Sequence, residues 1–293
     1  MSALGSALAV AEFLRKLRGR SQPVLVRAND GLMYVLKFAH NLQGPNLLFN
    51  EVMGSELYKA FGLPVPEWRS IQVTDSFLDR NDSCWFQTES GPIRPEAGLC
   101  FASRFLTGPR QPVWEILPGS YFGRVSNRGA FGLAWLLDVC AQHSENRQAI
   151  FLRTGDSGLR AVFIDHGSMF GGPNACDEPE PLAARYLDPR VYVQELLTGF
   201  RRGSDMLKWN SLWGLLKALP ADWRSDSALE RFAVCISRLA DPESVRRAAD
   251  SIVDLNRSTF ICDEAEHLRS DRFDTLVLCT GARRARTRHN ALA

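Results

Sequence analysis

The chain has 293 residues, of which 45% are hydrophobic and 23% charged, and this composition excludes a wholly disordered protein. Its formal net charge of +2 gives no general attraction to nucleic acid or anionic membranes, and no apolar run approaches the roughly 18 residues of a membrane span. The seven cysteines are odd in number and never form a C-x-x-C pair, which favours reduced thiols over a disulfide framework or a zinc site. We therefore expect a cytoplasmic protein of about two domains, with neither membrane nor direct nucleic-acid binding.

The first segment of the chain is predicted to be helical. Residues 7–18 carry apolar side chains at roughly helical spacing, which predicts an amphipathic helix. The Gly-Arg-Ser-Gln stretch at 19–22 then interrupts the pattern. Two β-rich runs follow at 23–27 and 32–38, and the Asp-Gly pair between them is typical of a tight turn, so we expect a β-hairpin.

A helix and two strands are predicted next. Residues 46–62 have apolar side chains near helical spacing, and Gly62 marks the end of this helix. The runs WRSIQVT (68–74) and GLCFASRFL (98–106) predict strands, separated by a polar insertion around 79–97.

The second part of the chain is richer in helices. A long apolar helix that begins near Arg128 ends in a polar loop at 143–148, and a strand is predicted at 149–153. A second strand, LRAVFI, leads directly into Asp165, and the pattern from 189 to 256 is helical. These elements predict an α/β protein of the α+β kind.

The change in character divides the chain into two lobes and a tail. We expect residues 1–106 to form a strand-rich N-terminal lobe and residues 107–275 to form a helical C-terminal lobe. Residues 276–293 are basic and rich in turn-forming side chains, and we expect this tail to be mobile.

A short loop and a strand lysine are the first candidates for function. The loop Gly19, Arg20, Ser21 and Gln22 precedes a strand, where backbone N–H groups could cradle phosphate oxygens, although most such loops are only turns. Lys37 lies in the apolar strand YVLKF, so its side chain either reaches solvent or is held by a carboxylate.

Glu51, in the next helix, is placed to be that carboxylate. A strand Lys paired with a helix Glu orients nucleotide phosphates in kinases. The alternative is an edge-strand Lys37 and a solvated Glu51, and the two interpretations weigh about equally.

The polar loop HSENRQ at 143–148 is the third candidate. Phosphoryl transfer needs a carboxylate that orients the attacking hydroxyl and an oxygen ligand for Mg²⁺ a few residues later. Glu145 could be the first and Gln148 the second. The alternative is a polar helix cap in which Arg147 merely pairs with Glu145.

Asp165, at the end of the following strand, is the fourth candidate. Mg²⁺ prefers oxygen ligands and uses one or two carboxylates beside the substrate phosphates. A hairpin between them could bring Gln148 and Asp165 to one metal ion. Alone, an Asp-His-Gly sequence is equally typical of a turn.

In this order and spacing, these residues resemble the HipA-like kinases, in particular compact bacterial HipA-related kinase domains. The resemblance covers most of residues 19–172. It rests on the segments DGLMYVLKF, FNEVMGSELYKAFGLPVPE, GLCFASRFL, GAFGLAWLLDV, RQAIF and FIDHGSMFGG. It implies a two-lobed protein-kinase-like fold that binds ATP and Mg²⁺ between the lobes.

The resemblance also implies roles for single residues. Lys37 would hold the phosphates, Glu51 would orient Lys37, and Asp165 would be a metal ligand. The segment 105–108 would be the hinge that meets adenine, and the expected cofactor-binding residues there are Arg104, Phe105 and Leu106.

The catalytic loop departs from the family pattern N-x-D-x-R-Q. His143 stands at the Asn position and Glu145 at the Asp position, whereas Arg147 and Gln148 match. A glutamate keeps the charge but moves the carboxylate by one methylene, and a displacement of about 1 Å can reduce a rate by about 10²-fold. His143 could itself act as a base, because an imidazole titrates near neutral pH.

The sequence therefore predicts an ATP- and Mg²⁺-dependent kinase that phosphorylates a hydroxyl, with Ser or Thr of a protein as the expected acceptor. Ser21 is by position a candidate for autophosphorylation, and an ordinary loop hydroxyl is the alternative. A second hypothesis is a pseudokinase that acts as a nucleotide-binding interaction module. A third is transfer to a small molecule. An antitoxin-like protein is one candidate partner beyond ATP.

Overall fold

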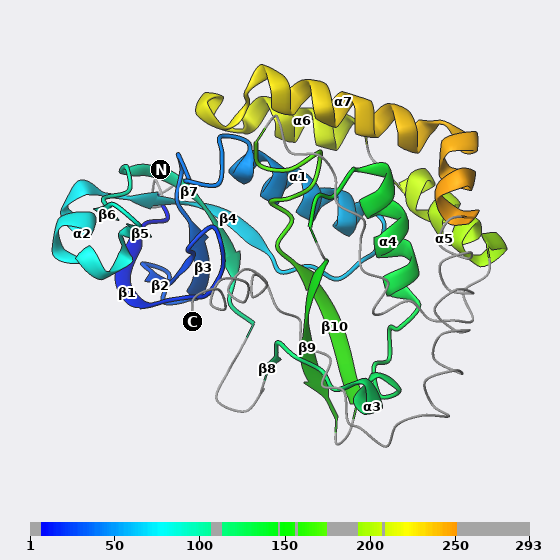
Figure 1. Ribbon diagram of the computed structural model, residues 1–293, viewed down its shortest axis with the longest axis horizontal. Helices are drawn as coiled ribbons and strands as arrows, with labels where there is room; N and C mark the ends of the chain where they lie inside the picture. Colours follow the sequence, from blue (N-terminus) through cyan, green and yellow to red (C-terminus); the bar gives the residue numbers. More distant parts are fainter. Residues whose placement is uncertain are drawn as a thin grey trace, which may run out of the picture.

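The computed structural model describes residues 7–106, 113–145, 147–155, 158–174, 193–206 and 209–250. A strand-rich lobe made from the N-terminal residues lies beside a second lobe that contains most of the helices and a smaller sheet (Figure 1). This is the predicted α/β architecture of two lobes. The basic tail at 276–293 lies outside the described residues.

The first lobe is built on a five-stranded sheet in which all neighbours are antiparallel. The strands, in their spatial order, are β1 (Val10–Lys16), β2 (Val24–Ala28), β3 (Met33–Lys37), β7 (Gly98–Arg104) and β4 (Trp68–Val73). Strands β2 and β3 form the predicted hairpin, with Val24 opposite Leu36. The predicted strands at 68–74 and 98–106 are confirmed as β4 and β7.

The helix predicted for residues 7–18 is wrong, because this segment contains strand β1. The spacing of its apolar side chains is compatible with a helix or with a strand, and pairing with β2 makes it a strand. Val10 lies opposite Ala28, and Lys16 lies opposite Val24. Just before the strand, Ala9 bridges to Gln72 of β4, so the sheet curls back toward its far edge. Tertiary pairing thus overrides the helical spacing.

Helix α1 (Leu47–Ala60) confirms the helix predicted at 46–62. Gly62, just after it, has a φ of +75°, a left-handed conformation that glycine adopts without steric cost and that ends the helix. The polar segment expected around 79–97 carries short elements of its own. These are α2 (Asp75–Arg80), η1 (Asp82–Cys84), β5 (Phe86–Thr88) and β6 (Gly91–Ile93).

The second lobe combines a three-stranded sheet with helices. The sheet order is β10 (Gly158–Ile164), β9 (Gln148–Thr154) and β8 (Val113–Trp114), and β9 and β10 are the two predicted strands of the hairpin. The helical elements are α3 (Gly119–Phe122), α4 (Ala130–Cys140), α5 (Val193–Met206), α6 (Trp209–Ala218), η2 (Ala221–Trp223) and α7 (Asp226–Ala240), and residues 242–250 are also helical.

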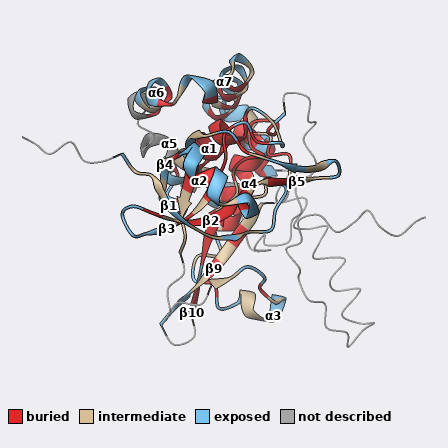
Figure 2. Ribbon diagram, turned by 90° about the vertical axis from the view of Figure 1, so that its left-hand side faces the viewer, coloured by how far each residue is buried: buried red, intermediate tan, exposed pale blue. Residues whose placement is uncertain are grey.

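Two hydrophobic clusters stabilise these lobes. The smaller one lies between the five-stranded sheet and the α2–β5 segment, and includes Val26, Leu36 and Phe77. The larger one surrounds α1 and α4 and reaches α7, and Figure 2 shows much of α1 and α4 as buried ribbon. Helix α1 belongs to the larger cluster, although it follows the hairpin of the first lobe. It therefore ties the first lobe to the second.

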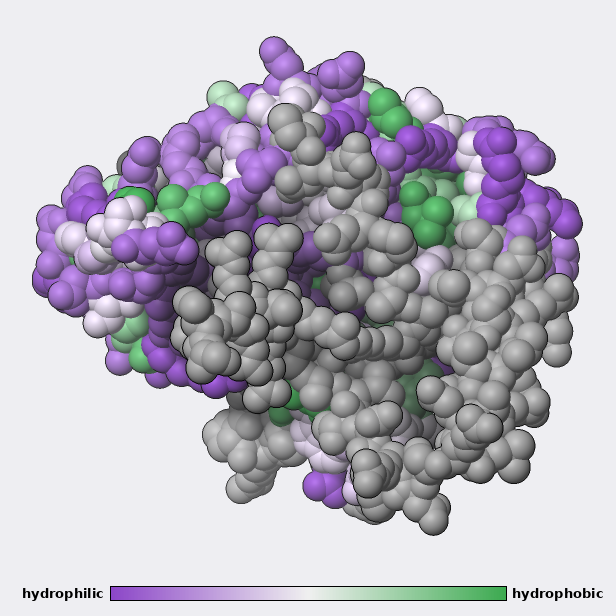
Figure 3. Space-filling view, in the orientation of Figure 1, coloured by the Kyte–Doolittle hydropathy of each residue, from purple (hydrophilic) through white to green (hydrophobic). Residues whose placement is uncertain are grey.

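The described surface is mainly hydrophilic in the view of Figure 3, where hydrophobic residues show as small separate patches. Scattered exposed side chains of this kind are normal for a folded protein. None of the helices in the described part of the chain combines the length and apolar character that a membrane crossing needs.

Candidate active site

Lys37, Glu51 and Asp165 come together where the two lobes meet. The Lys37 ammonium is ion-paired with Oε1 of Glu51 and lies 2.6 Å from Oδ1 of Asp165. Lys37 and Glu51 are both buried, and the side chain of Asp165 is 33% exposed. Lys37 ends strand β3, Glu51 lies on α1, and Asp165 directly follows β10, so three separate elements deliver one charged cluster.

Lys37 and Asp165 each stabilise the charged form of the other. Burial lowers the pKa of Lys37, but the carboxylates of Asp165 and Glu51 outweigh burial and raise it above its ordinary value. Burial also raises the pKa of Asp165, but the Lys37 ammonium outweighs it and lowers that pKa to about 2. At neutral pH the lysine is therefore charged and Asp165 is an anion.

Glu51 is also bonded to the chain that follows Asp165. Its Oε2 accepts from the backbone N–H of His166 at 3.2 Å, and its Oε1 accepts from that of Gly167 at 2.9 Å. Glycine is required nearby, because a Cβ on Gly167 would lie 2.4 Å from Leu47 Cδ1 and 3.0 Å from the Glu51 carboxylate. The helix carboxylate thus fixes Lys37 and the loop after β10 at the same time.

Gln148 lies next to Asp165 because of the hairpin register. It pairs with Ile164, the last residue of β10, and its Nε2 donates to Asp165 Oδ2 at 2.8 Å. One carboxylate and one neighbouring amide oxygen fit Mg²⁺, which takes one or two protein carboxylates and completes its shell with water and phosphate oxygens. Among the described residues, no three His, Cys, Asp or Glu side chains are grouped to hold a metal ion. An ion here would therefore depend on a phosphate ligand.

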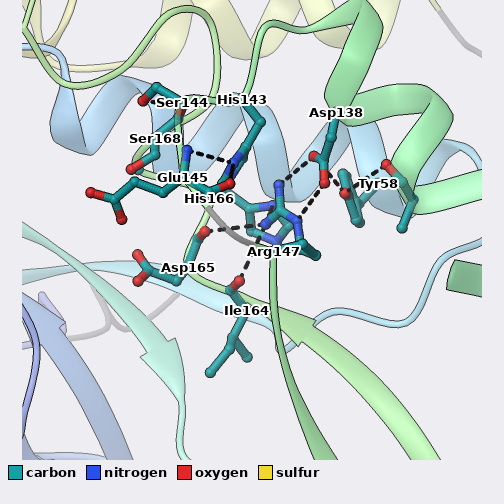
Figure 4. Close-up of polar contacts among 12 residues, drawn as sticks. Tyr58, Asp138, His143, Ser144, Glu145, Arg147, Ile164, Asp165, His166 and Ser168 are labelled. Atoms are coloured by element: carbon teal, nitrogen blue, oxygen red, sulfur yellow. Dashed lines mark hydrogen bonds and ion pairs between the residues drawn. The ribbon is translucent and has the colours of Figure 1, made fainter. Parts of the chain in front are cut away.

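Glu145 does not pair with Arg147, so this part of the helix-cap alternative is wrong. Its Oε1 instead lies 2.5 Å from Nη1 of Arg20 in the loop between β1 and β2. Arg147 turns the other way and forms a two-point ion pair with Asp138 of α4 (Figure 4). The Glu145 side chain is 25% exposed, so its carboxylate is partly open to solvent.

His143 is buried in the same loop. Its Nδ1 lies 2.5 Å from the Glu145 carbonyl oxygen, so it shapes the loop (Figure 4). Burial, with the nearby Arg147 charge, lowers the pKa of His143 to about 4. A neutral, buried imidazole with this pKa is a poor general base at neutral pH. The geometry therefore favours Glu145 over His143 for that role.

The loop of Gly19, Arg20, Ser21 and Gln22 joins the antiparallel strands β1 and β2, and its contact with phosphate stays a prediction. The Gln22 side chain is bonded twice to the backbone of Gln87 in β5, at 2.8 and 2.7 Å. Ser21 is buried, and its carbonyl accepts from Asn41 at 2.9 Å. The contacts with Gln87 thus hold the loop against the segment that runs from α2 to β6.

The expected hinge is described only in part. The backbone N–H of Phe105 donates to Met33 O at 2.9 Å, and the Arg104 guanidinium lies 5.7 Å from the centre of the Tyr34 ring. Leu106 is partly exposed, and residues 107 and 108 lie outside the described residues. The contact of this segment with adenine stays a prediction.

Three residues that belong to the site were not predicted from the sequence: Asp138, Tyr58 and His166. Asp138 and Tyr58 hold Arg147 from α4 and α1, and the His166 ring lies 4.7 Å from the Tyr58 ring. Asp138 did carry a signal, because it is the one charged residue in the apolar run AFGLAWLLDVC. A buried charge in such a run needs a partner.

This combination of a strand-rich lobe, a helical lobe and a charged cluster between them is a protein-kinase-like fold. The kinase CtkA of Helicobacter pylori shares this fold, with a TM-score of 0.54 and 12% sequence identity over 84% of this chain and 97% of CtkA. The Golgi casein kinase gives a TM-score of 0.39 with 11% identity over 90% of this chain and 74% of that one. Its Mn/ADP-bound structure gives 0.39 and 10% over 88% and 74%.

The amino-acid sequence itself matches one protein family over part of the chain. The family model of the HipA-like kinases matches residues 10–110, which contain the five-stranded sheet, Lys37 and Glu51. The predicted resemblance to that family is therefore confirmed over the first lobe. No curated protein matches the chain.

Proposed function

We propose that the protein is a kinase that transfers the γ-phosphoryl group of ATP to a hydroxyl of a protein Ser or Thr, with Mg²⁺ as cofactor. The observation that carries this proposal is the position of the buried Lys37 ammonium between Glu51 and Asp165. A charged lysine held in this way is presented to phosphate oxygens with its orientation already fixed. The fold shared with CtkA supports the same conclusion.

Each group has a role in this proposal. Lys37 binds the phosphates, and Glu51 keeps it in place. Asp165 and the Gln148 amide oxygen would hold Mg²⁺, which would neutralise charge on the phosphates. Backbone N–H groups of the 19–22 loop face the phosphates, and residues 104–106 adjoin the adenine.

Glu145 is the proposed base. Its carboxylate orients the acceptor hydroxyl and takes its proton as the bond from that oxygen to the γ-phosphorus forms. The bond from the γ-phosphorus to the bridging oxygen breaks, and ADP leaves with that electron pair. Before this step Arg20 must release Glu145, and the γ-phosphoryl group is a suitable new partner for the guanidinium.

One observation favours the alternative of a nucleotide-binding pseudokinase. The Glu145 carboxylate, already one methylene longer than the family's aspartate, is occupied by Arg20. Autophosphorylation of Ser21 would also require the loop to open, because this side chain is only 5% exposed. Such a module would bind nucleotide through Lys37 and Asp165 without transfer.

Two measurements separate these functions. Wild-type protein with γ-labelled ATP and Mg²⁺ should transfer label to itself or to a generic protein acceptor such as casein, and Glu145→Gln and Asp165→Asn should abolish transfer. Thermal shift with ATP, with and without Mg²⁺, reports binding. Mg²⁺-dependent stabilisation without transfer supports the pseudokinase. Transfer that survives in Asp165→Asn contradicts the proposed site.

A further inference from the structure

Arg147 is held on one side by a buried carboxylate. Its Nε lies 2.9 Å from Asp138 Oδ2 and its Nη2 lies 2.5 Å from Asp138 Oδ1. The Asp138 side chain is fully buried and that of Arg147 is 10% exposed. A two-point pair of this kind fixes the plane of the guanidinium as well as its position.

Tyr58 of α1 completes this support. Its hydroxyl lies 2.7 Å from Asp138 Oδ1 and 3.1 Å from the Ala134 carbonyl, and the guanidinium lies 4.7 Å from the centre of its ring. Burial, with the nearby Asp138, raises the pKa of Tyr58 well above its ordinary value, so the hydroxyl keeps its proton. Asp138 and Tyr58 therefore fix Arg147 from two different helices.

The remaining nitrogen of Arg147 points at the end of β10. Its Nη1 lies 3.2 Å from the Ile164 carbonyl oxygen, 3.1 Å from the Asp165 carbonyl oxygen and 3.1 Å from His166 Nδ1 (Figure 4). One nitrogen thus contacts three successive residues. Two of these contacts are made to the backbone, on both sides of the Asp165 Cα, and the third to the His166 side chain.

The Asp165 backbone is strained where these contacts occur. Its φ of +60° lies in the left-handed region, which is uncommon for non-glycine residues and costs free energy, although Asp is one of the residues that adopt it most often. Glu51 holds the N–H groups that follow, and Gln148 and Lys37 hold the carboxylate. Arg147 supplies a fixed partner for the carbonyl groups of Ile164 and Asp165.

We propose that Arg147, fixed by Asp138 and Tyr58, is a positioning residue that holds Asp165 in its left-handed conformation and so aims its carboxylate. It reaches no acceptor and carries no proton in the reaction. Its consequence for metal binding rests on the function proposed above. The conformational part can be tested without nucleotide.

The test uses Arg147→Lys, which keeps the buried charge but cannot reproduce the two-point contact of the guanidinium with Asp138. Without nucleotide, hydrogen exchange at the amides of His166 and Gly167 should become at least about ten-fold faster, because their acceptor geometry loosens. The Mg²⁺ concentration for half-maximal ATP-dependent stabilisation should rise about 10- to 100-fold, as for other residues that orient a metal ligand. ATP binding without Mg²⁺, through Lys37 and Glu51, should stay within about two-fold.

Asn127→Ala is the matched control. Asn127 fixes the same strand through two hydrogen bonds with Ala161, at 3.0 and 2.9 Å, four residues before Asp165. Asn127→Ala should lower the free energy of unfolding. It should leave hydrogen exchange at the His166 and Gly167 amides and the Mg²⁺ dependence of stabilisation by ATP unchanged.

A folded Arg147→Lys variant with wild-type amide exchange overturns the proposal. If Arg147→Lys does not fold, Tyr58→Phe decides in the same assays, because it removes only the hydroxyl that supports Asp138. Faster exchange supports the proposal and wild-type exchange refutes it. A wild-type protein that ignores Mg²⁺ and ATP contradicts the proposed kinase function, while the exchange result still decides the role of Arg147.

Discussion

Arg20 and Glu145 are joined by an ion pair of 2.5 Å although 125 positions separate them in the chain. The pair connects the loop between β1 and β2 to the loop after α4. The Arg20 side chain is 68% exposed, and water screens its attraction for Glu145. The pair is therefore suited to open when a stronger anion arrives.

The first prediction concerns the strength of this pair. In a double-mutant cycle of Arg20→Ala and Glu145→Ala, the coupling should be below about 1 kcal/mol, as for other exposed ion pairs. Urea unfolding of the four proteins measures it. A coupling of several kcal/mol would mean that the closed state is a stable lock, which nucleotide could not easily open.

The second prediction concerns Glu51. Glu51→Ala removes the partner of a buried lysine and the acceptor of two backbone N–H groups, so it should cost about 3–5 kcal/mol of unfolding free energy. Lys59→Ala, at an exposed position of the same helix, should change it by less than about 0.5 kcal/mol. Denaturant unfolding compares the two, and equal effects would show that Glu51 is only a helix-surface residue.

The third prediction is a loss of stability in acid. The pKa of His143 is about 4 in the folded protein and about 6.5 when unfolded, so the unfolded chain binds more protons between these values. Stability is therefore fully present above about pH 6.5 and falls by roughly 3 kcal/mol as the pH approaches 4. His166, whose pKa burial and Arg147 lower well below its ordinary value, adds to the same trend. Asp165 adds a further loss from about pH 4 to about pH 2.

The measurement is the melting temperature from pH 8 to pH 4. His143→Gln should flatten the curve between pH 6.5 and pH 4, whereas His40→Asn should not, because His40 is exposed and Asn tolerates its φ of +48°. Identical pH curves for wild type and His143→Gln would contradict a buried neutral His143.

The fourth prediction concerns Gly54 of α1. A Cβ there would lie 2.6 Å from both His166 Cβ and Met169 Sδ, so Gly54→Ala should destabilise the protein by about 1–3 kcal/mol despite the better helix propensity of alanine. At Gly199 of α5 a Cβ meets nothing within 4 Å, and Gly199→Ala should stabilise by up to about 1 kcal/mol. Thermal unfolding of both variants checks the opposite signs.

The parts of the structure that were predictable are those set by local patterns. The hairpin before Lys37, helix α1 and the strands on either side of Gln148 and Asp165 follow from turn residues and periodicity. The contact between Lys37 and Glu51 follows because consecutive elements usually pack together.

The remaining features depend on pairing over long distances. Residues 10–16 form a strand because β2 is available to pair with them, and the preceding Ala9 bridges to β4. Arg147 has an acidic residue two positions away, but its partner is Asp138 on the preceding helix. The periodicity of a sequence does not show which of two carboxylates an arginine pairs with, because this depends on which carboxylate is buried beside it in the folded protein.

The close packing of α1 on the chain after Asp165 has a mechanical consequence. A methyl group fits neither at Gly54 nor at Gly167, and Glu51 bonds to the backbone of Gly167. We therefore expect helix α1 and residues 165–172 to move together. Lys37, the last residue of β3, is ion-paired with both Glu51 and Asp165, so the end of β3 is tied to the same unit. Labels that report the Glu51 to Gly167 separation should therefore show no change when nucleotide is added.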